Sequence, residues 1–286
     1  MHPLNMCAAM CLAVSLLVGC SDTSPPSEEP VRVEECGPTL RESDGREWVC
    51  TFADNFDGRR LDRTKWTPRI YHATGISTAR ACFTDDPRNI AVEGGELLLT
   101  VRKVNTPVVC AGAPAYYTSG SVSTYRKFSQ QYGRFEARVK VAKTQAPGLK
   151  EAFWLWPDDR IFSRTRWPAA GEIDIMETYS KYHGLAVPFL HYTVNDNGGP
   201  RPGVNTAWHC QAKRGVYNTY TLTWTPTKLA IAVNGVTCLV NTSSDPAFHK
   251  PYIASLTSAL GVGSNALTAN TPLPATMSVD YVRVWR

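Results

Sequence analysis

Hydrophobic and polar residues alternate in short runs along most of the chain from Phe52 onward. Side chains of a β-strand point to opposite faces with a period of two, so each run predicts a strand with one buried face. Asn234-Gly235 predicts a two-residue hairpin turn, and no segment sustains a helical apolar period or repeats at a fixed spacing. The pattern predicts an all-β protein with a single sandwich of about 230 residues. The clearest runs are 97–102, 133–141, 220–224, 229–233 and 277–285.

One run carries three carboxylates among aliphatic residues, at 171–178. Glu172 and Asp174 share one face of a strand, and the isoleucines beside them point into a core. Strict alternation places Glu177 on the apolar face. One extra residue, accommodated as a β-bulge at 175–176, returns it to the acidic face, and such bulges are common near active sites.

The spacing of these acids suits a pair of catalytic carboxylates. With the bulge, Glu172 and Glu177 lie roughly 13 Å apart at Cα, and side chains that lean together can close the carboxyl gap to about 5.5 Å, as in retaining glycosidases. Asp174 lies between them, so the three cannot all be charged at neutral pH and the group holds at least one proton. A solvated acidic face and a calcium site built from oxygen ligands are the alternatives.

The first residues have the features of an export signal. An apolar stretch over 7–19 ends in Leu17-Val18-Gly19-Cys20, which resembles a bacterial lipobox. We expect residues 1–19 to be a lipoprotein signal peptide, with a lipid on Cys20 and a polar, proline-rich tether over 20–45. An ordinary secretory signal and a transmembrane helix are the alternatives; the apolar run is short for a span. The protein is then extracytoplasmic, anchored to the membrane or secreted.

Six of the nine cysteines lie outside the leader and the lipobox. An even number in an exported chain favours disulfides, and no Cys-x-x-Cys spacing indicates zinc. Six cysteines allow 15 pairings, and we take nearest neighbours in sequence as the prediction: 36–50, 82–110 and 210–238.

The formal net charge of +5 is mild, and no basic cluster is interleaved with aromatic residues. The chain therefore gives no indication of nucleic-acid binding. It has no phosphate-binding loop, no dinucleotide fingerprint and no Gly-x-Ser-x-Gly nucleophile motif. We expect a monomer.

The segment Trp167-Pro-Ala-Ala-Gly-Glu-Ile-Asp-Ile-Met-Glu-Thr resembles the catalytic strand of glycoside hydrolase family 16 in its bulged form, Glu-x-Asp-x-x-Glu. The resemblance extends to segments 52–66, 117–140 and 279–285, which look like the opening, central and last strands of the family. It implies a concanavalin-like β-jelly-roll of two antiparallel sheets, with the substrate cleft on the concave sheet, and a catalytic domain over 46–286. One departure is Lys150-Glu-Ala-Phe-Trp, where the family often has Trp-Pro-Ala-Phe-Trp.

The resemblance also implies roles for the acids. Glu172 would be the nucleophile and Glu177 the acid/base. Asp174 would hydrogen-bond Glu172. The family's pattern requires no cofactor but often includes a structural calcium ion, for which Asp280 would be the side-chain ligand.

Four further residues are expected in the cleft. Alternation places Trp154 and Trp156 on one face, and Trp154 matches a cleft-floor tryptophan of the family. Trp167 precedes the catalytic strand, and His191 resembles a histidine beside the acid/base. Asn89 resembles a substrate-contacting asparagine.

The implied function is retaining, endo-acting hydrolysis of a β-glycan. The substrate is a polysaccharide, and β-1,3-glucan is the first choice because the 167–177 segment looks most like the laminarinase branch. Galactan hydrolysis and transglycosylation stay open. A non-catalytic glycan-binding domain on the same fold is the alternative from another class, and retention of all three acids argues against it.

Overall fold

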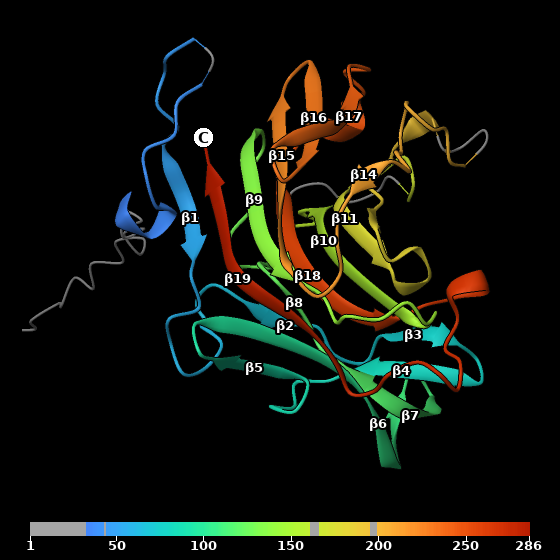
Figure 1. The fold of residues 1–286 in the computed structure, drawn as a ribbon. Helices are drawn as coiled ribbons and strands as arrows, with labels where there is room; N and C mark the ends of the chain where they lie inside the picture. Colours follow the sequence, from blue (N-terminus) through green and yellow to red (C-terminus); the bar gives the residue numbers. More distant parts are fainter. Residues whose placement is uncertain (1–32, 43, 161–165, 195–198) are drawn as a thin grey trace, which may run out of the picture. The chain divides into compact units, whose positions relative to one another are not determined.

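The computed structural model describes residues 33–42, 44–160, 166–194 and 199–286. Their strands form two large sheets and one small one (Figure 1). The strands of the larger sheet follow one another in the order β17 (Val236–Asn241), β16 (Lys228–Val233), β15 (Tyr217–Thr225), β9 (Gly133–Lys140), β19 (Ala275–Trp285), β6 (Glu96–Cys110), β7 (Ala113–Ser119), β4 (Ala79–Phe83) and β3 (Ala73–Ile76). Two more strands pair with members of this row: β1 (Cys50–Asp54) with β19, and β5 (Ile90–Glu93) with β6.

The second sheet positions the acids. Its strands run in the order β13 (Phe189–His191), β11 (Glu172–Tyr179), β10 (Leu149–Pro157), β18 (Tyr252–Leu260), β8 (Ser121–Ser123) and β2 (Thr67–Pro68). The small sheet pairs β12 (Leu185–Ala186) with β14 (Cys210–Gln211). Strands of the two large sheets pair antiparallel except β4 with β7, so the predicted all-β sandwich of antiparallel sheets is confirmed.

Helical structure in the described residues is confined to short 3₁₀ turns, and none of their helices is long and apolar enough to cross a membrane. The five predicted strands form β6, β9, β15, β16 and β19. The predicted hairpin joins β16 to β17, and Asn234 and Gly235 both have positive φ, at 50° and 80°. The 3₁₀ turns are η1 (Val33–Cys36), η2 (Ser180–Tyr182), η4 (Pro246–Phe248) and η5 (Gly263–Asn265).

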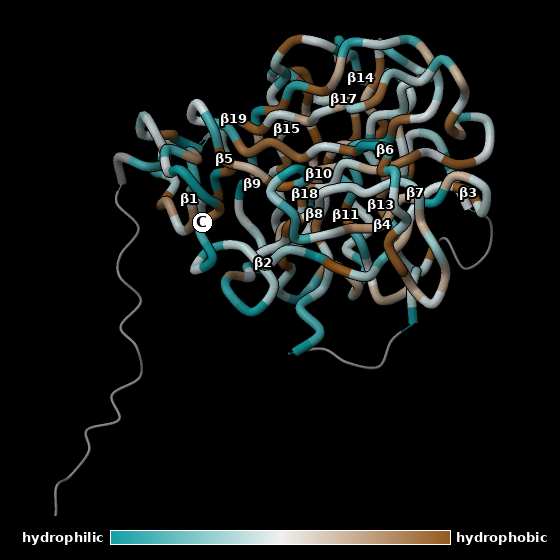
Figure 2. Tube along the Cα trace, turned by 90° about the horizontal axis from the view of Figure 1, so that it is seen from below, coloured by the Kyte–Doolittle hydropathy of each residue, from teal (hydrophilic) through white to brown (hydrophobic). Residues whose placement is uncertain are grey.

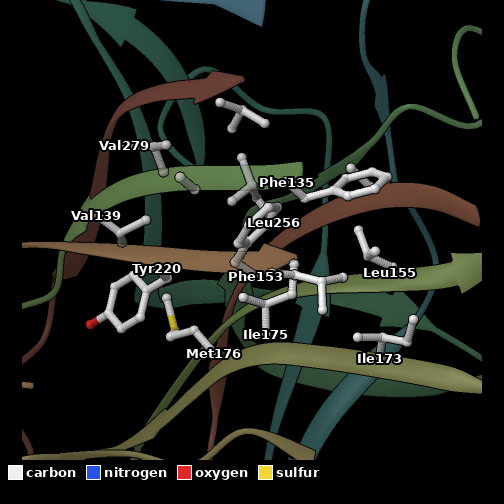
Figure 3. Close-up of a cluster of buried hydrophobic side chains, with 14 of the residues drawn as sticks. Phe135, Val139, Phe153, Leu155, Ile173, Ile175, Met176, Tyr220, Leu256 and Val279 are labelled. Carbon is white, nitrogen blue, oxygen red and sulfur yellow. The ribbon is translucent and has the colours of Figure 1, made fainter. Parts of the chain in front are cut away.

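The main hydrophobic core lies between the two large sheets (Figure 3). Figure 2 colours the chain by the hydropathy of each residue and shows hydrophobic and hydrophilic stretches interspersed along it. Burying one large aliphatic or aromatic side chain stabilises the fold by about 1.5–3 kcal/mol. The second sheet contributes Phe153, Leu155, Ile173, Ile175, Met176 and Leu256, and the larger sheet contributes Phe135, Val139, Tyr220 and Val279.

Three disulfides join the cysteine pairs expected from nearest neighbours: 36–50, 82–110 and 210–238. The first ties part of the predicted tether to the domain, because Cys36 is buried and bonded to Cys50. The domain bounds themselves stay a prediction. The expected signal peptide, Cys20 and the first part of the tether lie outside the described residues.

Candidate active site

The three acids lie on β11, between β10 and β13. The pairing register with β10 shifts by one residue: Asp174 pairs with Trp154, Met176 pairs with Phe153, and Ile175 has no partner. Glu177 then pairs with Ala152. The shift puts Met176 in the core and lets Glu177 line the same cavity as Glu172 and Asp174.

The chain enters β11 through a constrained glycine. Gly171 has a φ of 92°, and a Cβ there would lie 2.0 Å from the Tyr252 hydroxyl and 3.1 Å from the Ala247 carbonyl oxygen. Only glycine adopts this conformation without strain, and no side chain fits beside Tyr252. This close approach lies one residue before β11, which begins at Glu172.

The acids open into a cavity of about 660 Å³. Its wall combines carboxylates with indoles and other aromatic rings, the mixture expected of a sugar-binding cleft. Trp154, Trp167 and His191 line it, and their contact with a substrate stays a prediction.

Glu172 accepts a hydrogen bond from Trp167 Nε1 at 2.7 Å. Burial, followed by the charge of Asp174, raises the pKa of Glu172 to about 8, against the opposing effects of His191 and the Trp167 hydrogen bond. Trp167 is 53% exposed. Its position fixes the carboxylate while leaving one indole face open to a ligand.

Asp174 contacts His191 rather than Glu172. The distance from His191 Nε2 to Asp174 Oδ2 is 3.3 Å, and no hydrogen bond joins Asp174 to Glu172 among the described side chains. Burial, followed by the charge of Glu177, raises the pKa of Asp174 well above its ordinary range. Burial lowers the pKa of His191. A protonated Asp174 can therefore donate to a neutral His191.

His191 thus belongs to the Glu172 side of the site. It pairs with Glu172 across β13 and β11, and its ring stacks on Phe189 with centroids 4.3 Å apart. The sequence expectation placed it beside Glu177. The register of β13 on β11 explains why the observed position differs from the expected one, because residue 191 lies opposite residue 172 and not opposite residue 177.

Glu177 is held by two donors that the sequence did not indicate as site residues. Lys150 forms an ion pair with one carboxylate oxygen, and the Tyr179 hydroxyl donates to the other at 2.7 Å. Burial lowers the pKa of Lys150, but the charges of Glu177 and Asp174 outweigh it and the net shift is upward. Burial and the charge of Glu177 also raise the pKa of Tyr179. Both groups stay protonated donors at neutral pH.

Tyr179 also packs against Trp208, with rings 6.3 Å apart and nearly parallel. Trp208 is 43% exposed. The period of two from Glu177 was the signal that could have identified Tyr179. Trp208 lies in a loop, where no periodicity points to it.

The aromatic floor continues into a second cavity of about 340 Å³, which shares Arg69, His72 and Trp154 with the first. Trp154 and Trp156 both line it, with ring centroids 6.1 Å apart. Trp154 Nε1 donates to Thr257 Oγ1 at 3.0 Å, which fixes the indole on β10 against β18. The two cavities together span the width of the second sheet, from β13 to β2.

Two predicted site residues lie elsewhere. Asn89 is 2% exposed; its amide accepts from Thr84 Oγ1 and donates to the Thr100 carbonyl oxygen, so it stabilises the turn before β5. Asp280 accepts from Arg138 Nη1 at 2.6 Å. A guanidinium in contact with this carboxylate does not fit a calcium ligand.

Among the described residues, one group of candidate metal ligands occurs within the site. Single ligand atoms of Glu172, Asp174 and His191 lie within 4.8 Å of one another. Calcium takes six to eight oxygen ligands, so two carboxylates and an imidazole match it poorly. The arrangement is better suited to proton transfer and nucleophilic attack.

Comparisons with known proteins agree on one family. The family model described as "Glycosyl hydrolases family 16" matches residues 78–283. A keratan-sulfate endo-1,4-β-galactosidase of Sphingobacterium multivorum is 30% identical over 82% of this chain and 54% of its own length. A glucan endo-1,3-β-glucosidase A1 of Niallia circulans is 28% identical over 82% of this chain and 37% of its own.

A solved structure is also similar. The endo-1,3-β-glucanase (laminarinase) catalytic domain of Thermotoga petrophila RKU-1 is 25% identical, with a TM-score of 0.71 over 84% of this chain and 98% of that one. The chain matches almost the whole of this domain. It spans only about half of the S. multivorum relative and just over a third of the N. circulans relative.

Proposed function

The chain belongs to glycosyl hydrolases family 16, and from that premise we propose that it is a retaining, endo-acting β-glycan hydrolase whose first-choice substrate is a β-1,3-glucan. One observation carries the proposal: Glu172, Asp174 and Glu177 line a single cavity together with two indoles. Carboxylates supply the nucleophile and the acid/base, and indoles supply flat platforms for pyranose rings.

The proposed reaction has two steps. Glu172 attacks the anomeric carbon while Glu177 gives its proton to the leaving glycosidic oxygen, so that a glycosyl–Glu172 ester forms and the aglycone leaves as an alcohol. Glu177 then takes a proton from water, whose oxygen attacks the same carbon and releases Glu172. Each step inverts the configuration of the anomeric carbon, so the product retains the configuration of the substrate.

Asp174 keeps a proton next to the nucleophile in this scheme. It is more deeply buried than Glu172, so it is the better holder of the proton that the group requires. A neutral Asp174 leaves Glu172 free to ionise for attack. The contact with His191 fixes the orientation of the protonated carboxyl.

The linkage and the sugar are part of the proposal. The N. circulans and T. petrophila proteins support a β-1,3-glucan, and the S. multivorum protein supports a galactan as the second candidate. Transglycosylation uses the same residues with a sugar hydroxyl in place of water. A non-catalytic binding domain is disfavoured because all three acids are present and face one cavity.

A polysaccharide panel tests the function directly. We expect the purified full chain to shorten β-1,3-glucan to a ladder of oligosaccharides, and proton NMR of the first product to show the β-anomer before mutarotation. Release of the α-anomer first would exclude the retaining mechanism. Cleavage of a galactan alone would replace the substrate and keep the mechanism.

We further propose that the protein is exported and held at a membrane by a lipid on Cys20. The lipobox-like 17–20 segment and the polar stretch after it support this. Replacing Cys20 with Ala is expected to move the protein from the membrane fraction to the soluble fraction of cells. Unchanged partitioning would contradict the anchor.

A further inference from the structure

Arg69 follows β2 directly and lines both cavities of the cleft. Its guanidinium lies over the Trp154 ring, 5.0 Å from the centroid, and 5.9 Å from the centroid of Phe83. Contact with an indole and a phenyl ring holds the planar group in one place. The cation is therefore fixed beside the tryptophan that forms the floor of the cleft.

No carboxylate is bonded to this guanidinium in the part of the chain that the structure describes. The interactions of this side chain with the described residues are its two ring contacts and the through-space charge of Glu172, and none of them uses the five N–H donors of the group. Arginine stays charged in proteins, and a half-buried charge without a partner is costly. The geometry leaves its donors available to a ligand.

The other charged groups of the two cavities do not leave N–H donors available to a ligand in this way. Lys150 is paired with Glu177. Burial lowers the pKa of His72, and the charge of Arg69 lowers it further. Glu172 acts on Arg69 only through space, and Asp159 lines the smaller cavity from an exposed position. Among the described residues that line the two cavities, Arg69 is thus the cation that no carboxylate contacts directly.

We propose that Arg69 forms a subsite for an anionic substituent, a sulfate ester or a carboxylate, on the sugar that packs against Trp154. The inference rests on the proposed function, because it places a glycan in this cleft. Both anions present two oxygens that match the guanidinium fork, and such charge-assisted pairs are the stronger hydrogen bonds. The anion would compensate the cation, which a sugar hydroxyl cannot do.

The test compares one polymer in three forms: neutral β-1,3-glucan, the same glucan partially sulfated, and the same glucan carboxymethylated. The full chain and its Arg69→Gln and Arg69→Lys variants are assayed on each. Arg59→Gln is the matched control, since Arg59 is exposed and lines neither cavity. The two anionic forms distinguish a sulfate from a carboxylate.

We expect Arg69→Gln to lower kcat/KM on one or both anionic forms by about 10- to 100-fold, mainly through KM, and to change the neutral form by less than about threefold. Arg69→Lys should restore part of the loss, and Arg59→Gln should act like the parent. An equal loss on all three polymers would show that Arg69 tunes Glu172 instead, and would overturn the subsite. No loss on either anionic form would overturn it as well.

Binding separates this inference from the proposed function. In affinity electrophoresis with the inactive Glu172→Gln variant, an anionic polymer should retard migration, and adding Arg69→Gln should abolish most of the retardation. If the parent cleaves none of the polymers but this difference persists, the hydrolase proposal fails and the subsite stands. Retardation that is independent of Arg69 would refute the subsite whatever the activity.

Discussion

At the scale of single residues, the site divides its charges between two sides. Glu172, Asp174 and His191 form the side on which a proton is held, and Glu177 is bound by Lys150 and Tyr179. In a retaining mechanism one carboxyl attacks as an anion while the other donates a proton, so the proton that these contacts place on the Glu172 side must pass to Glu177 before the attack. The roles can therefore be separated by removing each acid in turn.

Glu172→Ala and Glu177→Ala should each lose several orders of magnitude in rate on a polymer while keeping the fold. On a dinitrophenyl β-glycoside of a short glucan, whose leaving group needs little protonation, Glu177→Ala should keep its first step and Glu172→Ala should not. Azide should rescue Glu177→Ala to a β-glycosyl azide and Glu172→Ala to the α-anomer, as read by NMR. The same anomer from both variants would refute the assignment.

The raised pKa of Glu172 also predicts a dependence of stability on pH. Its pKa is about 8 in the folded chain, against 4.5 for an unperturbed glutamate. Below pH 4.5 both states bind the proton; between 4.5 and 8 the folded state binds more, so stability from this group falls as pH rises. Thermal unfolding should show Glu172→Gln gaining on the parent from pH 5 to pH 8. A constant difference across that range would contradict the shift.

At the scale of elements, the start of β11 fixes where the acids lie. Gly171 has positive φ and approaches Tyr252, and the register shift at Ile175 follows four residues later. Together these features decide which residues of the strand face the cavity. A side chain at position 171 would clash with the Tyr252 hydroxyl and displace the start of the strand.

We expect Gly171→Ala to destabilise the fold by about 1–3 kcal/mol from backbone strain, with an added steric cost at Tyr252. Activity should fall with it, because Glu172 is the next residue. Gly184→Ala is the matched control, since a Cβ there meets nothing within 4 Å. Chemical denaturation of both variants makes the comparison, and equal stability of the two would contradict the role of Gly171.

At the scale of the whole molecule, three disulfides join structural elements at sequence separations of 14, 28 and 28 residues. Cys36–Cys50 joins η1 to β1, Cys82–Cys110 joins β4 to the end of β6, and Cys210–Cys238 joins β14 to β17. The hydrophobic cluster around Cys82 and Cys110 is small, with Ala115 and Val108 as its other members. The order of these strand ends therefore depends on the cross-link.

Removing Cys82–Cys110 by a double Cys→Ala substitution should lower the free energy of unfolding by about 2–4 kcal/mol. Thiol titration of the denatured, unreduced parent should find no free thiol among the six domain cysteines. Two or more reactive thiols, or a double variant as stable as the parent, would contradict this account.

The sequence by itself determined the features that depend on neighbours along the chain. Alternation located the strands, Asn234-Gly235 the hairpin, and the interleaved acids of 172–177 the centre of the site. For the strands and the hairpin the physical cause is local, because a period of two and a turn conformation are set within a few residues. The nearest-neighbour pairing of the cysteines matches the structure, but the sequence allowed 15 pairings and did not choose among them.

Only the tertiary structure decided which distant residues meet. Lys150 reaches Glu177 because β10 lies beside β11, and Arg69 reaches Trp154 although 85 positions separate them in the sequence. The same assembly removed Asn89 and Asp280 from their expected roles by giving each a protein partner. Contacts between strands depend on register and sheet order, which side-chain periodicity along one strand does not specify.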